Sequence, residues 1–220
     1  MKIKACIFDM DGTLVNSIMD IAFSMNSALS NLGYNEIELN KFNALVGRGF
    51  DKFVIDTLKL LSLEYNNPNL QDKLYKEFVK EYNKNLSSKT QPYENIKTLL
   101  ENMNDLKIPI GILSNKNHEE LISLVKNIFG NILFFEVRGY SKKFPPKPDP
   151  ENALDMILEL NIQKEEIAYI GDSDVDMLTA INAGFIPIGV SWGFRSVQEL
   201  KQNGAKHIIH KPLELLDLIK

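Results

Sequence analysis

The sequence is poor in cysteine, histidine and arginine. Cys6 is the single cysteine among 220 residues, which excludes an internal disulfide, and its position in an apolar run is typical of a small buried side chain. Only three arginines occur, Arg48, Arg138 and Arg195, so side chains that could clamp an anion through two parallel hydrogen bonds are few. Any arginine close to a candidate site is therefore informative.

Long apolar runs and a strong excess of charge are also missing. No segment contains the roughly 18 consecutive apolar residues that a transmembrane helix needs, and acidic residues interrupt the first apolar stretch too early for a signal peptide. The formal net charge of −4 offers no electrostatic basis for binding nucleic acid or an anionic membrane. We therefore expect a cytoplasmic protein with neither partner, and the composition leaves monomer and homodimer both open.

Hydrophobic spacing divides the chain into an α/β part and a helical part. In residues 16–86 the apolar side chains recur only at helical spacing, which predicts helices and no convincing strand. In residues 1–15 and 87–220, apolar β-branched runs alternate with helical patterns, and this predicts a parallel Rossmann-like sheet with helices on both faces. We therefore expect an α/β core domain (1–15 and 87–220) with an inserted α-helical domain (16–86).

Polar residues capable of chemistry follow the predicted strands. Ligands of such sheets bind outside the carboxyl ends of the strands, so the residues at these positions are the candidates for a site. We expect strands at residues 3–7, 108–113, 133–137, 167–170 and 186–190. The first four are followed, in order, by Asp9 and Asp11, by Ser114-Asn115-Lys116, by Lys147 in a proline-rich loop, and by the segment from Gly171 to Asp176.

Asp9 and Asp11 stand where the first predicted strand ends. If the backbone is still extended there, the i, i+2 spacing puts both carboxylates on one side, while Gly12 permits a sharp turn and Thr13 offers a hydroxyl. Two like charges this close need either a divalent cation or a proton on one of them. An ordinary turn after a strand also uses Asp and Gly, so this segment alone does not decide between a site and a turn.

Taken together, these residues fit phosphoryl transfer with Mg²⁺. Asp9, Asp11 and Asp172 offer the oxygen ligands that Mg²⁺ prefers, whereas no His or Cys stands among them at zinc-ligand spacing. A carboxylate beside Mg²⁺ and an ammonium stays ionised and can attack phosphorus, which gives an aspartyl-phosphate. Lys147, Ser114 and turn amides could neutralise the phosphoryl oxygens, and Asp11 could protonate the leaving oxygen and later activate water.

The same segments resemble the four sequence motifs of the haloacid dehalogenase superfamily of phosphohydrolases. The segment DMDGTL at 9–14 is similar to the first motif, Ser114 to the second, Lys147 within KPDP to the third and GDSDVD at 171–176 to the fourth, and the resemblance covers essentially the whole chain. It implies a Mg²⁺-dependent phosphatase of a small phosphorylated metabolite, with an aspartyl-phosphate intermediate and phosphoglycolate as the first guess. The dehalogenases themselves lack the second aspartate, so Asp11 points to phosphoryl transfer.

The resemblance also implies a role for each matching residue. Asp9 is the expected nucleophile, Asp11 the general acid/base, and Asp176 a supporting residue that orients Lys147 or a metal-bound water. The expected metal ligands are Asp9, Asp172 and, through its backbone carbonyl, Asp11. The residues expected to contact the phosphoryl group are Gly12, Thr13, Ser114, Asn115 (through its amide) and Lys147, and two of these, Ser114 and Lys147, complete the catalytic set.

The helical insert at 16–86 resembles the helical cap of the superfamily, which closes over the site. Its loop Gly47-Arg48-Gly49 is similar to a glycine-bearing loop in phosphoglycolate phosphatases, so Arg48 is a candidate for contacting a substrate carboxylate or phosphate. An interhelical turn with a solvated arginine is the alternative. Lys116, after the second motif, also resembles the phosphoglycolate phosphatase pattern, although those enzymes more often carry threonine where this chain has Ser114.

Other functions stay open at this point. A phosphosugar mutase of the β-phosphoglucomutase type shares the aspartates and the cap, and inorganic pyrophosphatase or another sugar-phosphatase activity is possible within the same fold. A non-catalytic phospho-acceptor switch also combines carboxylates, Mg²⁺, a hydroxyl and a lysine, but such a domain carries no inserted cap. Release of inorganic phosphate by the pure protein separates the phosphatase from the switch.

Two segments near the carboxyl end receive no catalytic role. His207 and His210 flank two isoleucines, and although a metal pair is conceivable, the preferred interpretation is an ordinary position on a short strand remote from the site. Residues 192–195 follow the fifth predicted strand and are expected to form a wall near Asp172 without binding a ligand.

Overall fold

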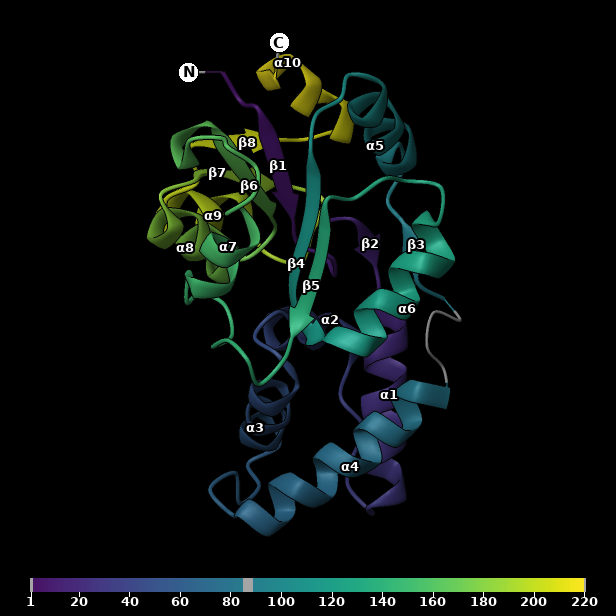
Figure 1. Cartoon of the computed structure of the whole chain (residues 1–220). Coiled ribbons are helices and arrows are strands. Elements are labelled where there is room, and N and C mark those ends of the chain that lie inside the picture. The colour runs from purple at the N-terminus through teal and green to yellow at the C-terminus, as the bar shows by residue number, and fades with distance from the viewer. Residues whose placement is uncertain (1, 85–88, 220) are drawn as a thin grey trace. The chain divides into compact units, whose positions relative to one another are not determined.

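The computed structural model describes residues 2–84 and 89–219, and the chain divides into two compact units (Figure 1). Unit 1 consists of Met1–Asn16 and Pro92–Lys220, and unit 2 consists of Ser17–Gln91. The domain boundary expected between residues 86 and 87 falls outside the described residues. Unit 2 begins and ends within the chain, as an insertion into unit 1.

Unit 1 is built on a six-stranded sheet. Its strands are β1 (Ala5–Phe8), β4 (Ile110–Asn117), β5 (Glu136–Tyr140), β6 (Ile167–Gly171), β7 (Ile186–Val190) and β8 (His207–Ile209). They lie in the order β5-β4-β1-β6-β7-β8, and every neighbouring pair is parallel. The carboxyl ends of the strands therefore meet at one edge of the sheet, and the predicted α/β class with a parallel sheet is confirmed.

Helices cover both faces of this sheet, as expected for parallel strands that are apolar on both sides. Along β1, Cys6 and Phe8 belong to one apolar core, whereas Ala5 and Ile7 belong to a second core on the opposite face. The first core includes side chains of α5 (Ile96–Asp105), α6 (His118–Phe129) and α10 (Leu215–Ile219), and the second includes those of α7 (Glu151–Met156) and α8 (Asp174–Ala183). The remaining helices of unit 1 are α9 (Val197–Gln202) and the 3₁₀ turns Lys164–Glu166 and Pro212–Glu214. None of the helices in the described part of the chain combines the length and the apolar character that a membrane span requires.

The bounds of β4 and β5 differ most from the sequence-based expectation, and β1 (Ala5–Phe8) differs slightly from the expected range 3–7. β4 continues to Asn117, four residues past the predicted end, because Asn117 pairs with Tyr140 of β5 after a shift in register. β5 begins at Glu136, three residues later than predicted. Its apolar start was misassigned because the backbone of Leu133 bonds to the side chain of Asn104 instead of to a strand. Local apolar composition therefore placed both strands correctly but not their ends.

Unit 2 is helical, as predicted, although the short helix at Leu39–Leu45 was not expected from the sequence. Four helices lie in its described part. They are α1 (Ile18–Asn31), α2 (Leu39–Leu45), α3 (Phe50–Leu60) and α4 (Pro68–Lys84). Phe78 of α4 lies in an aromatic cluster, with its ring centroid 4.8 Å from that of Phe50, 5.2 Å from that of Phe53 and 5.6 Å from that of Tyr82. The loop that joins α2 to α3 has Gly47 at φ 108° and Gly49 at φ 82°, a conformation that favours glycine on both sides of Arg48.

A two-stranded sheet that the sequence analysis did not predict joins β2 (Val15–Asn16) to β3 (Gln91–Pro92). Strands of two residues carry too little periodicity to be recognised from a sequence. Within unit 2, the buried carboxylate of Asp20 accepts hydrogen bonds from the backbone N–H groups of Lys89 and Thr90 and from the Thr90 hydroxyl, at 2.6–3.1 Å. Asp20 thus holds the end of unit 2 to the first turn of α1.

The aromatic cluster of unit 2 generates a prediction about stability. Phe78→Ala should lower the free energy of unfolding by about 3–5 kcal/mol, because the removed ring is fully buried and leaves a cavity. The matched control is Phe23→Ala, since Phe23 is 53% exposed, and it should cost less than about 1 kcal/mol. Urea unfolding followed by circular dichroism measures both, and equal losses would contradict the importance of the cluster.

Candidate active site

Three buried carboxylates meet at the carboxyl edge of the sheet. Asp9 follows β1, Asp172 follows β6 and Asp176 lies in the first turn of α8. One oxygen from each of them lies within 4.8 Å of the others, and this is the arrangement among the described residues that could hold a metal ion. The sequence had placed all three at this edge, and the fold brings them together.

The ammonium of Lys147 lies between two of these carboxylates. Its Nζ is 2.8 Å from Oδ1 of Asp9 and 2.7 Å from Oδ1 of Asp176, and the side chain is 3% exposed. The third contact of Nζ is the hydroxyl oxygen of Tyr169, at 3.0 Å. A lysine ammonium has three N–H donors, so each donor has a partner.

The backbone of Lys147 is held from β4. The side chain of Asn115 accepts a hydrogen bond from the N–H of Lys147 at 2.9 Å and donates one to its carbonyl at 3.2 Å. The carboxamide of Asn115 is therefore engaged in fixing the loop that carries the lysine, a contact that the sequence analysis did not anticipate. The neighbouring Ser114 is buried at the end of β4, and its hydroxyl accepts a hydrogen bond from the backbone of Lys116 at 3.3 Å.

Asp176 is oriented by the start of α8. Its Oδ2 accepts hydrogen bonds from the backbone N–H groups of Asp172 and Ser173 and from the Ser173 hydroxyl, while Ser173 caps the helix in return. Its Oδ1 remains directed at Lys147. Gly171 precedes this turn, and a Cβ on it would lie 2.2 Å from the Cβ of Asp176, so a larger residue would displace the carboxylate.

Asp172 is held by residues from two segments of unit 1. The Thr13 hydroxyl donates to its Oδ1 at 3.2 Å, and the Phe194 backbone N–H donates to its Oδ2 at 2.7 Å. Gly12 has φ 88°, and a Cβ there would lie 2.3 Å from Oδ2 of Asp172. Trp192 donates through Nε1 to the Thr13 carbonyl at 3.0 Å, so residues 192–195 do form a wall beside Asp172, as the sequence predicted.

Asp11 has a separate cationic partner. Its Oδ2 is 3.0 Å from Nζ of Lys116, whose side chain is 1% exposed. Its Oδ1 is buried and has no hydrogen-bond partner among the described residues. The repulsion expected between Asp9 and Asp11 is therefore relieved by two different ammonium groups, Lys147 for the first and Lys116 for the second.

Burial and charge shift the pKa values of these groups in a consistent way. Burial, opposed by Lys147 and reinforced by Asp176, raises the pKa of Asp9 to about 6. Burial, together with the charges of Asp176 and Asp9, raises the pKa of Asp172 well above its ordinary value, against the Phe194 N–H and Arg195. For Lys147, burial alone would lower the pKa, but the charges of Asp176 and Asp9 outweigh it and hold that pKa well above its usual range. The single positive charge of Lys147 therefore does not neutralise the three carboxylates, and a further cation would be bound favourably beside them.

Tyr169 is the site residue that sequence reasoning missed. It lies within β6, it is fully buried, and its hydroxyl contacts both Lys147 and the carbonyl of Leu113. A signal was present, because a tyrosine inside an otherwise apolar buried strand needs partners for its hydroxyl. Tertiary structure was needed to show that one of these partners is the site lysine.

Other residues considered from the sequence belong to other elements. Arg48 belongs to unit 2, on the loop between α2 and α3. His207 lies on β8, the edge strand of the sheet, and His210 contacts the hydroxyl of Ser191 at 2.8 Å through Nδ1. The group of possible metal ligands found among the described residues consists of Asp9, Asp172 and Asp176.

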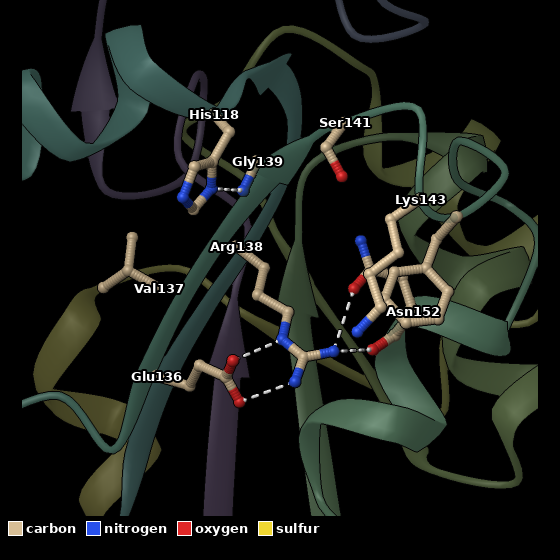
Figure 2. Close-up of a pocket in the computed structure, with 9 residues that line it drawn as sticks. His118, Glu136, Val137, Arg138, Gly139, Ser141, Lys143 and Asn152 are labelled. Carbon is tan, nitrogen blue, oxygen red and sulfur yellow. Dashed lines mark hydrogen bonds and ion pairs between the residues drawn. The ribbon is translucent and has the colours of Figure 1, made fainter.

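A pocket of about 240 Å³ lies between β5, α7 and the loop that leads to Lys147 (Figure 2). Figure 2 shows Arg138 in it with both carboxylate oxygens of Glu136 on one side and Asn152 on the other. Arg138 also contacts the carboxylate of Asp155 at 2.6 Å. Because this guanidinium is already balanced by two carboxylates, the pocket is a poor candidate for binding an anionic substrate.

Comparisons with known proteins identify the family of the chain. The chain is 29% identical to a phosphoglycolate phosphatase of Chromobacterium violaceum over 99% of its own length and 97% of the relative's, and 28% identical to one of Neisseria meningitidis over 92% and 86%. A solved structure of a candidate phosphoglycolate phosphatase from Lactobacillus delbrueckii superposes with a TM-score of 0.93 at 26% identity, covering 100% of this chain and 99% of that one. Residues 6–190 match the family described as haloacid dehalogenase-like hydrolase. Since this match spans most of the chain, the protein belongs to the haloacid dehalogenase-like hydrolase family.

Proposed function

We propose that the protein is a Mg²⁺-dependent phosphatase that hydrolyses a small phosphorylated metabolite through an aspartyl-phosphate on Asp9. The observation that carries the proposal is the ammonium of Lys147 between Asp9 and Asp176, next to the third carboxylate, Asp172. A buried carboxylate paired with an ammonium can serve as a nucleophile, and the surrounding charges match what phosphoryl transfer requires. Phosphoglycolate is the first substrate to test, because the relatives compared above carry that name.

The donor set fits Mg²⁺. Carboxylate oxygens dominate it, and a bound Mg²⁺ would neutralise developing negative charge on the phosphoryl oxygens. Both oxygens of Asp176 are already used, one by Lys147 and one by the start of α8. We therefore assign Asp9, Asp172 and the backbone carbonyl of Asp11 to the metal, and Asp176 to the orientation of Lys147.

Asp11 is suited to move protons. Lys116 holds its Oδ2, while its Oδ1 has no partner in the described part of the chain and is left to meet the leaving-group oxygen. In the proposed reaction Asp11 protonates that oxygen as Asp9 attacks phosphorus, and then removes a proton from the water that hydrolyses the aspartyl-phosphate. Lys116 lies beside Asp11, and we assign its ammonium to a contact with an anionic group of the substrate.

The phosphoryl group is assigned to the turn after β1 and to the end of β4. Ser114 supplies a hydroxyl and Lys147 a positive charge, whereas Asn115 contributes by fixing the loop of Lys147. Gly12 and Thr13 shape the turn beside Asp172. Unit 2 is proposed to act as the cap, with Arg48 on its α2–α3 loop as a contact for the substrate's second anionic group.

The first prediction concerns turnover. With Mg²⁺, the purified protein should release inorganic phosphate from phosphoglycolate in a screen that also contains hexose phosphates and pyrophosphate. Asp9→Asn should reduce this release to background, because the amide cannot attack phosphorus. Asp105→Asn, at an exposed position, is the matched control and should retain full activity. Turnover by the Asp9→Asn variant would refute the aspartyl-phosphate, and sugar-phosphate isomerisation without phosphate release would favour a mutase.

The second prediction concerns the leaving group. Asp11→Ala should lower the phosphorylation rate by roughly 100-fold or more with an alkyl phosphate such as phosphoglycolate, because no acid then protonates the leaving oxygen. The loss should be much smaller with p-nitrophenyl phosphate, whose leaving group needs no proton. Single-turnover kinetics with both substrates measure the difference. An equal loss with the two substrates would argue against general acid catalysis by Asp11.

The third prediction concerns pH and metal. The pKa of Asp9 is raised to about 6 in the folded protein and is about 3.9 in an unfolded chain, so the metal-free fold binds the proton more tightly. The free energy of unfolding should therefore be highest below pH 4 and should fall by up to about 3 kcal/mol as the pH rises through 6. Thermal melts in EDTA should show this fall. Asp9→Asn should remove the part that comes from Asp9, whereas Asp172, whose pKa is also raised by burial, should keep a fall of its own.

Addition of Mg²⁺ provides the matching test of the metal site. At pH 7, millimolar Mg²⁺ should raise the melting temperature of the wild-type protein, because the ion binds the folded carboxylates and not the unfolded chain. Asp172→Asn should abolish this increase, whereas Asp105→Asn should preserve it. A Mg²⁺ effect that is the same in both variants would place the bound ion elsewhere.

A further inference from the structure

Tyr169 is a polar residue in an apolar place. It occupies the middle of β6 opposite Ile7 of β1, and its ring packs in the core that contains Ile7 and Leu113. A phenolic hydroxyl buried at such a position needs hydrogen-bond partners, since an unpaired polar group in the core is costly. The structure supplies two partners, the carbonyl of Leu113 at 2.7 Å and the ammonium of Lys147 at 3.0 Å.

The direction of these two bonds follows from chemistry. A backbone carbonyl can only accept, so the hydroxyl of Tyr169 donates its proton to Leu113. A lysine ammonium can only donate, so the same oxygen receives an N–H of Lys147 through a lone pair. Burial raises the pKa of Tyr169 well above its ordinary value, which keeps this proton in place. The hydroxyl therefore presents a fixed acceptor to the lysine.

That acceptor completes the environment of Lys147. Two of its N–H donors go to Asp9 and Asp176, and the third would be buried without a partner if Tyr169 lacked its hydroxyl. Two carboxylates alone leave the ammonium free to rotate and to shift between them, whereas three acceptors from three chain segments define its position. Since Leu113 directly precedes Ser114, the same hydroxyl also ties the end of β4 to the lysine.

We infer that Tyr169 is a positioning residue of the site, acting through Lys147 by holding its ammonium against Asp9. This inference rests on the proposed function, in which the ammonium assists the attack of Asp9 on phosphorus. The effect on catalysis is indirect, because the hydrogen bonds of the hydroxyl run to Lys147 and to the carbonyl of Leu113. The acceptor atom is what matters, so a phenylalanine of nearly the same shape should fail to replace it.

The experiment removes this one oxygen. Tyr169→Phe should lower kcat for p-nitrophenyl phosphate by about tenfold, the value expected for one hydrogen bond to a charged group, with little change in KM. Tyr140→Phe is the matched control, since no hydrogen bond of the Tyr140 hydroxyl is found in the described part of the chain, and it should keep kcat within about twofold. Circular dichroism and melting temperature verify that both variants are folded.

A double-mutant cycle distinguishes positioning from a general structural effect. In a Lys147→Met background, where no ammonium remains to be held, Tyr169→Phe should change the residual single-turnover rate by less than about twofold. The inference is overturned if Tyr169→Phe keeps kcat within twofold of wild type. It is equally overturned if the substitution costs the same factor with and without the lysine.

A measurement independent of activity separates this inference from the proposed function. The ¹⁵N-edited NMR spectrum of the wild-type protein should contain a slowly exchanging ammonium signal that is lost in Lys147→Met. Tyr169→Phe should accelerate its hydrogen exchange by tenfold or more, while Tyr140→Phe should leave it unchanged. If the wild type releases no phosphate but this pattern holds, the proposed function fails and the positioning role stands. Unchanged exchange in Tyr169→Phe refutes the positioning role even in an active phosphatase.

Discussion

The buried ammonium of Lys147 is the interaction on which the rest of the site depends. Removing one partner from a buried ion pair typically costs about 3–5 kcal/mol, because the other charge is left uncompensated. The surroundings of this lysine are arranged to keep every partner in place. Asn115 holds its backbone, Tyr169 takes its third N–H, and the helix start at Ser173 orients Asp176. The position of Asp9 is thus coupled to β4, to β6 and to the first turn of α8.

Glycine allows the carboxylates to approach the backbone closely. A Cβ on Gly12 or on Gly193 would come within 2.3 Å of an atom of the Asp172 side chain, and a Cβ on Gly171 would lie 2.2 Å from Asp176. These glycines follow β1, end β6 and follow β7, so three neighbouring strand ends close around the same acidic groups. Such close packing buries these carboxylates, and burial strengthens their electrostatic contacts.

Much of the fold was predictable from periodicity. Where the prediction was wrong, the error has a specific physical cause. The strands Ile167–Gly171 and Ile186–Val190 agree closely with the ranges expected from the sequence, because both are short, continuous apolar runs. The predicted start of β5 was wrong because the side chain of Asn104 bonds to the backbone of Leu133 and holds that apolar residue outside the sheet. The pairing of β2 with β3 was missed because two residues define no period.

For the site itself, the sequence alone determined which groups reach the edge of the sheet. Parallel strands bring their carboxyl ends to one edge, so residues that follow successive strands had to converge there. The tertiary structure decided which charge meets which. Lys147 is 138 residues away from Asp9 in the chain, and Lys116 rather than Lys147 pairs with Asp11. These pairings, and the third bond from Tyr169, depend on side-chain directions and on packing between strands, and no local pattern in the sequence encodes them.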